Sequence, residues 1–235
     1  MDNHPDHRPV AALYVDPRGC YADLPGVDVW GIDRDARRYE GPYPVVAHPP
    51  CARWCKLAGL VESRGGPKRR EDDGCFASAL AAVRHWGGVL EHPAYSTAWR
   101  AHGLIEPPSD GGWVFADDDN GVTCHVWQAR YGHEARKPTW LYANGVIVPR
   151  LLWGLIEGDY AVISMCGYRS GEGPKRISGR KAEATPVAFR DVLLGMARSS
   201  YHVRVRSLRK FLGNHRTSIW WETPLRVGRN GGKWA

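Results

Sequence analysis

Two short segments carry side chains capable of nucleophilic chemistry, and each follows a stretch typical of a buried strand. Cys51 comes after the apolar residues 44–47 and is separated from them by a His-Pro-Pro turn. Glu91 comes directly after the apolar residues 89–90 and precedes His92. In open α/β sheets, functional side chains lie just beyond the carboxyl ends of the strands. The sequence therefore predicts that a thiol and a carboxylate meet at one edge of a sheet.

The chemistry of this pair depends on the thiol losing its proton. A cysteine becomes a thiolate only where its surroundings favour the negative charge, and three of its neighbours in sequence are basic: His48, Arg53 and Lys56. A thiolate beside a carboxylic acid suits attack on an electron-poor ring, because the acid can hold a ring nitrogen while the sulfur adds to a ring carbon. The candidate catalytic residues at this stage are Cys51, Glu91, His48 and His92.

The elements that must position these residues alternate between apolar strands and amphipathic helices. Strands are expected at residues 11–15, 27–32, 44–47, 89–90, 140–143 and 160–163, with helices from Asp72 or Asp73 to Gly87 and from Thr185 onward. This alternation predicts an α/β fold with a largely parallel sheet in a domain of residues 1–200. Because strand–helix–strand connections are right-handed, the strands before Cys51 and Glu91 should be parallel, and neighbours or next neighbours.

Length and composition exclude several classes of protein. The chain has 235 residues, 43% of them hydrophobic, and no apolar run approaches the roughly 20 residues needed to span a bilayer. The polar N-terminus does not resemble a signal peptide, and six scattered cysteines are too few for a disulfide scaffold. We therefore expect a soluble cytoplasmic protein with no membrane partner.

The excess positive charge gathers in the last part of the chain. The net charge is +7, and residues 201–235 hold eight basic residues against one acidic residue, so residues 1–200 sum to zero. Trp220, Trp221 and Trp234 lie in the same segment. Clustered basic and aromatic side chains indicate a nucleic acid as the partner, and the alternative is a solvated tail that keeps the protein soluble. The candidate nucleic-acid-binding residues are Arg204, Arg206, Arg209 and Lys210 in this basic, Trp-rich segment, and Lys68, Arg69 and Arg70 in an earlier loop.

The Cys–Glu pair resembles the catalytic motifs of the cytosine-C5 DNA methyltransferases. In that family a Pro-Cys-Gln motif carries the nucleophile and a Glu-Asn-Val or Glu-Asn-Pro motif its partner. Here Pro50-Cys51-Ala52 and Glu91-His92-Pro93 stand in the same order. A third family motif, Gln-x-Arg-x-Arg before a strand, is similar to Gln128-Ala129-Arg130 and to residues 135–142. The chain looks most like the small phage-borne relatives of these enzymes, whose location would be the host cytoplasm.

The resemblance implies a reduced, Rossmann-like methyltransferase sheet, DNA as the partner, a DNA-modifying activity and a role for each matching residue. In the family the cysteine adds to C6 of a cytosine flipped out of the duplex, the glutamate binds N3 and an arginine binds O2. Carried over to this chain, these residues are Cys51, Glu91 and either Arg130 or Arg136.

The resemblance also implies S-adenosylmethionine as the cofactor, with Asp16 and Asp33 near the ends of the first two strands as the matching residues. The turn after Asp16 contains one glycine where the family has several, and about ten residues lead to the next strand, too few for a strand–helix–strand connection. We therefore expect this cofactor to bind weakly or not at all.

Two other functions stay open. A catalytically inactive member of the same fold would only bind DNA, through the basic segment. A metal-dependent enzyme would use the soft ligands His48, Cys51, Cys55, Cys75 and His92, but their spacing is not typical of a zinc finger or ribbon, and the sequence predicts no metal site.

Overall fold

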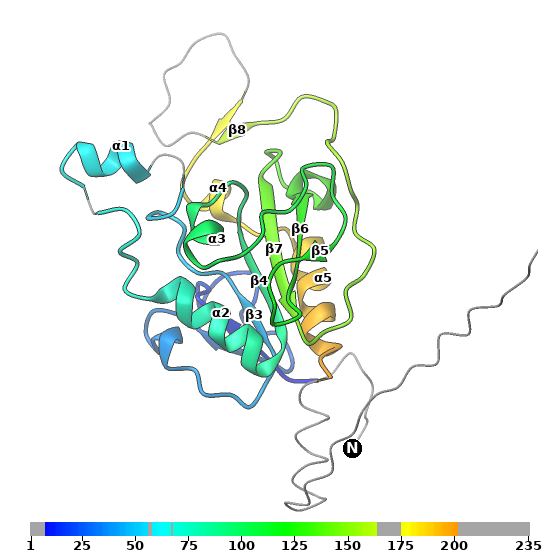
Figure 1. The fold of residues 1–235 in the computed structure, drawn as a ribbon. Coiled ribbons are helices and arrows are strands. Elements are labelled where there is room, and N and C mark those ends of the chain that lie inside the picture. Colours follow the sequence, from blue (N-terminus) through cyan, green and yellow to red (C-terminus); the bar gives the residue numbers. More distant parts are fainter. Residues whose placement is uncertain (1–7, 56–57, 67, 164–174, 202–235) are drawn as a thin grey trace, which may run out of the picture.

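A seven-stranded sheet runs through the centre of the computed structural model, which describes residues 8–55, 58–66, 68–163 and 175–201 (Figure 1). The strands lie in the order β2-β1-β3-β4-β7-β6-β5. Their bounds are β1 Val10–Leu13, β2 Val27–Trp30, β3 Val45–Ala47, β4 Gly88–Pro93, β5 Val114–Phe115, β6 Val122–Trp127 and β7 Pro138–Asn144. The first four strands pair in parallel, whereas β7 is antiparallel to both β4 and β6, and β5 is antiparallel to β6. The expected α/β fold with a large, mostly parallel sheet is confirmed.

The helices and a small second sheet surround this centre. The helices are α1 Ala58–Ser63, α2 Cys75–Trp86, α3 Thr97–Ala101, α4 Arg180–Glu183 and α5 Val187–Arg198, with single 3-10 turns at Ala36–Arg38 and Gln128–Tyr131. The strands β8 Val162–Ile163 and β9 Arg176–Ile177 pair in parallel. No helix in the described part of the chain is long and apolar enough to cross a membrane.

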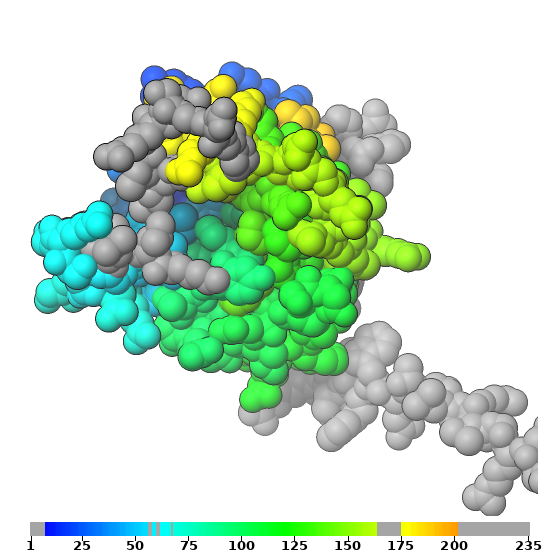
Figure 2. All heavy atoms as spheres, turned by 90° about the horizontal axis from the view of Figure 1, so that it is seen from above, coloured from blue at the N-terminus to red at the C-terminus, as the bar shows by residue number. Residues whose placement is uncertain are grey.

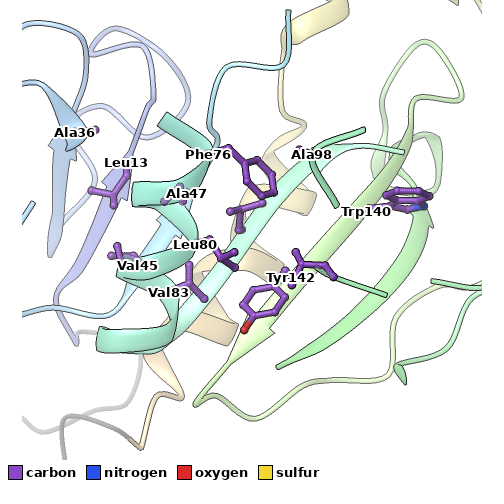
Figure 3. Packing of buried hydrophobic residues seen from close by; sticks show 14 of the residues in the cluster. Leu13, Ala36, Val45, Ala47, Phe76, Leu80, Val83, Ala98, Trp140 and Tyr142 are labelled. Carbon is purple, nitrogen blue, oxygen red and sulfur yellow. The ribbon is translucent and has the colours of Figure 1, made fainter. Parts of the chain in front are cut away.

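Helix α2 covers one face of the sheet and α5 covers the other (Figure 1). Figure 3 shows Phe76, Leu80 and Val83 of α2 directed at the sheet, where Val45 and Ala47 of β3 lie. Alternate residues of a strand point to opposite faces, so the intervening Val46 packs on the α5 side with Phe189, Leu193 and Met196. The two helices predicted from the sequence are therefore present, and each has one buried face.

The two main helices begin differently. Gly74 occupies the N-cap position of α2, and the carboxylate of Asp72, two residues earlier, accepts hydrogen bonds from the backbone N–H of Phe76 at 2.8 Å and of Gly74 at 3.1 Å. At the start of α5, Pro186 occupies the N-cap position and no side chain caps the helix, so the helix begins two residues after Thr185, where the sequence predicted its start.

Strand β4 is longer than the sequence indicated, and this changes where its polar residues lie. It continues to Pro93, because β7 pairs with it along its whole length, from Gly88↔Asn144 to Pro93↔Thr139. Glu91 and His92 are therefore inside the strand, and the strand alternation turns them to opposite faces of the sheet.

The link between β1 and β2 contains no helix, yet these strands pair in parallel, as in Val10↔Val27. Residues 14–26 cross over as an irregular loop that packs tightly against the end of β2. A Cβ atom at Gly31 would lie 2.8 Å from Pro17 Cγ and 2.9 Å from the Val15 carbonyl oxygen, so only glycine fits there.

Candidate functional site

The segments predicted to carry chemistry meet at one edge of the sheet. Strands β3 and β4 are parallel neighbours in the register Val46↔Val89 and Ala47↔Leu90, so their carboxyl ends lie side by side, as predicted. The short helices α3 and α4 lie over this edge (Figure 1), and α1 stands out from the body beside it, as Figure 2 shows from above.

Glu91 is the centre of a buried hydrogen-bond network. His48 Nδ1 lies 3.1 Å from Glu91 Oε2, and Gln128 Nε2 donates to Glu91 Oε1 at 2.8 Å. On the far side of the imidazole, His48 Nε2 is 2.9 Å from the hydroxyl of Tyr21, which comes from the β1–β2 loop. An ionised carboxylate only accepts hydrogen bonds, so His48 donates from Nδ1. The network joins β3, β4 and the turn after β6.

The charge on Glu91 is stabilised by this network. Burial by itself would raise the pKa of Glu91, but the hydrogen bond and charge of His48, with the charge of Lys137, outweigh it and lower the pKa to about 2. Glu91 is therefore a carboxylate at neutral pH and offers a hydrogen-bond acceptor.

Cys51 lies beside Glu91, but its thiol is not activated in the free protein. Burial, reinforced by the negative charge of Glu91, raises the pKa of Cys51 to about 11. The basic residues expected to favour a thiolate are engaged elsewhere: His48 with Glu91 and Tyr21, and Arg53 with the carbonyl oxygen of Lys68 at 3.3 Å. Lys56 lies outside the described residues. The expectation that His48 and Arg53 lower the pKa of Cys51 is wrong.

Lys137 is a cation of this site that the sequence did not single out. Its Nζ donates to the backbone carbonyl oxygens of Glu183 at 2.9 Å and Ala184 at 2.8 Å. Burial lowers the pKa of Lys137, while the charges of Glu91 and Cys51 act to raise it. The sequence signal for Lys137 was its place next to Arg136, in the segment similar to the third family motif.

The two arginines expected to bind a base make other contacts. Arg130 donates to the backbone carbonyl oxygens of Gly154 and Leu155, each at 3.0 Å. Arg136 is exposed, with its guanidinium carbon 5.9 Å from the centre of the Tyr160 ring. These contacts fasten the loop before β8, and the cation facing Glu91 is Lys137 instead.

His92 belongs to the hydrophobic core on the α2 face. Its ring is fully buried, with its centre 5.3 Å from the ring of Phe76 and 6.2 Å from that of Trp99. Burial lowers the pKa of His92 to about 4, so the imidazole is neutral at neutral pH. The structure separates His92 from the hydrogen bonds of Glu91, because β4 turns the two side chains to opposite faces.

The residues matched to S-adenosylmethionine do not form a cradle for it. Asp16 is exposed and accepts a bond from the backbone N–H of Arg18 at 2.9 Å, and Asp33 is also exposed. At the end of β1, Tyr14 is hydrogen-bonded to Ser78 of α2, and no helix follows in the β1–β2 loop. A glycine-rich turn opening a helix, which nucleotide-type ligands use in such folds, does not occur at this position, and the group does not fit here.

The basic residues assigned to DNA are divided between described and undescribed parts of the chain. Lys68 pairs with Glu71 at 3.6 Å and Arg69 with Glu62 at 2.9 Å, while Arg70 is exposed. The candidates in the basic segment are Arg204, Arg206, Arg209 and Lys210, and they lie outside the described residues. Of the segment predicted to follow the domain of residues 1–200, the structure describes Tyr201 and no later residue.

Among the residues that the structure describes, no three His, Cys, Asp or Glu side chains group as metal ligands. Of the soft ligands considered, His48 is bound to Glu91 and Tyr21, and Cys55 Sγ lies 3.7 Å from the Ala52 carbonyl oxygen. In comparisons with known proteins, no protein-family model, curated protein or solved structure matches this chain.

Proposed function

We propose that this protein modifies a pyrimidine base of DNA, with Cys51 as the nucleophile that adds to the ring. The observation that carries the proposal is the parallel pairing of β3 and β4, which brings Cys51 and the buried Glu91 to one sheet edge. The resemblance of both segments to the cytosine-C5 methyltransferase motifs supports the same assignment.

Each residue of the site has a distinct task in this proposal. When a base enters, the Cys51 thiol gives up its proton to solvent water, the sulfur bonds to C6 of the ring, and the electrons of the C5–C6 double bond move to C5. Glu91, held in place by His48 and Gln128, binds the edge of the base. Lys137 is the nearby cation that offsets the negative charge of the adduct.

Deuterium exchange tests this step without any cofactor. When a thiolate adds to C6, C5 can take a deuteron from heavy water and then lose its original proton. The sulfur then leaves C6. Oligonucleotides with a single cytosine or uracil, incubated with the protein in heavy water, should gain one mass unit at that base. Bound DNA that gains no deuterium would contradict the proposed chemistry.

S-adenosylmethionine has no step in this proposal, because the turn after β1 does not fit it. We expect calorimetry to give no saturable binding, with a Kd weaker than about 1 mM, which corresponds to roughly −4 kcal/mol. A tight one-to-one complex would show that the exposed Asp16 and Asp33 form a cofactor site after all.

A second function is favoured by one observation. The pKa of Cys51, raised to about 11, means that the resting thiol is protonated, as expected of a protein that only binds DNA on this fold. In that case the protein would bind oligonucleotides, and the deuterium exchange would match that of a sample without protein.

The basic segment should supply most of the affinity for DNA in either function. If five of its cations contact phosphates, log K against log salt concentration should have a slope of about −4 to −5 on duplex DNA. Charge reversal at Arg204, Arg206 and Arg209 should flatten that slope and weaken binding at every sequence alike. The Cys51→Ser variant is the matched control and should keep the wild-type slope. Wild-type affinity and slope in the folded charge-reversal variant would remove the segment from the interface.

A further inference from the structure

We infer that the base accepted by this site carries a hydrogen on its N3 ring nitrogen, as uracil-type bases do and cytosine does not. The inference rests on the proposed function and names its substrate more closely. It follows from counting the hydrogen-bond donors and acceptors that surround Glu91.

The donors around Glu91 are already in use. His48 donates to Oε2 at 3.1 Å, and the amide of Gln128 donates to Oε1 at 2.8 Å and to Thr139 Oγ1 at 3.0 Å. The hydroxyl of Thr139 donates in turn to the Lys137 carbonyl oxygen at 3.1 Å. Both hydrogens of the Gln128 amide are therefore used.

The groups that stay open are acceptors. Each oxygen of a carboxylate has about two lone-pair positions, so both oxygens of Glu91 can accept one more bond. The buried Oε1 of Gln128 has no hydrogen-bond partner among the described residues. A base edge placed against Glu91 must therefore donate. The N3–H of a uracil-type base donates, whereas N3 of cytosine presents a lone pair.

Lys137 complements this edge with a donor. Its ammonium group has three hydrogens, and two of its bonds go to the carbonyl oxygens of Glu183 and Ala184. One hydrogen stays available for a carbonyl group of the base. A uracil-type base has a carbonyl on each side of N3–H. Glu91 can therefore accept from N3–H while Lys137 donates to whichever of the two carbonyl groups lies on its side.

Cytosine would need an added proton to fit the same groups. Its amino group could donate to one oxygen of Glu91, but its N3 lone pair would then face the other oxygen. The titratable groups that face Glu91 are His48, Lys137 and Cys51, with Tyr21 behind His48 and His92 next along β4. The positive charges among them oppose a proton on Glu91, so the cost of binding cytosine grows with pH.

The test compares two oligonucleotides that differ only in one dU or dC, using the full chain in heavy water. At pH 7.5 we expect exchange at C5 of dU to be at least about tenfold faster, since one pH unit of proton uptake corresponds to a factor of ten. The ratio of the two rates should fall about tenfold for each pH unit toward pH 6. Because both bases use the same thiol, its ionisation cancels in the ratio.

A substitution at the carboxylate gives an independent readout. In the Glu91→Gln variant the amide can donate as well as accept, so the preference for dU should fall toward equal rates. Glu106→Gln, at an exposed carboxylate, is the matched control and should keep the wild-type ratio. Faster exchange of dC at pH 7.5, or a ratio independent of pH, would overturn the inference and leave the proposed function standing. Exchange with neither base would overturn both.

Discussion

Replacing Cys51 by serine should reduce deuterium exchange at C5 of the base by on the order of 10³-fold or more, because the nucleophile is lost. The serine hydroxyl is a far weaker nucleophile, and the neighbouring His48 is not free to act as its base, since it is bonded to Glu91 and Tyr21. Mass spectrometry of the digested oligonucleotide gives the rate for wild type and variant.

The matched control for this prediction is Cys55→Ser. Cys55 lies in the same turn, but its Sγ faces the Ala52 carbonyl oxygen and not Glu91. We expect this variant to exchange at the wild-type rate. Equal rates for Cys51→Ser and wild type, with DNA binding intact, would remove Cys51 from the chemistry.

The second large effect concerns the stability of the fold in acid. The pKa of buried His92 is about 4 in the folded chain, lowered by burial from an ordinary value of 6.5. Below pH 6.5 the unfolded chain binds a proton that the folded chain does not, so the free energy of unfolding should fall until about pH 4. The difference between these two pKa values corresponds to about 3 kcal/mol in the free energy of unfolding.

Glu91 adds a separate loss at lower pH. Its pKa is lowered from 4.5 to about 2 in the folded chain, so its contribution is present above pH 4.5. This contribution to the free energy of unfolding is lost as the pH falls from 4.5 through 2, because Glu91 takes up a proton and is no longer a charged partner of His48. The two residues therefore act in successive pH ranges.

Urea unfolding of the His92→Phe variant checks the first range. Phenylalanine is apolar and can pack against Phe76 and Trp99, and it binds no proton. Between pH 6.5 and pH 4 the variant should lose about 3 kcal/mol less than wild type. Parallel pH profiles for the two proteins would contradict a neutral, buried His92.

Much of the fold could be predicted from the sequence because its signals are local. The apolar runs of β1 to β3 and the spacing of Phe76, Leu80 and Val83 each lie within a dozen residues or fewer. The parallel pairing of β3 with β4 followed from a single helix between them. These features are set by neighbours along the chain.

The composition of the site could not be predicted in the same way, because it depends on a strand far along the chain. Pairing with the antiparallel strand β7 lengthens β4. The longer strand contains Glu91 and directs the side chain of His92 to the opposite face of the sheet. A second pairing, of β6 with β7, brings Gln128 and Lys137 beside Glu91. The motif-like segments contain Gln128 and Lys137 as well as the thiol and the carboxylate, but they do not indicate that these two side chains lie beside Glu91.

The antiparallel strand β7 affects the order in which parts of the chain fold. Strands β3 and β4, with α2 between them, can form from contacts close in sequence. Strand β7 can pair with β4 only when the long segment that contains α3, β5 and β6 closes into a loop. Closing such a loop costs chain entropy before the new contacts repay it, so pairings of this kind are slow. During refolding, burial of the core under α2 should therefore precede the assembly of Glu91 with Gln128 and Lys137, and reactivity should return last.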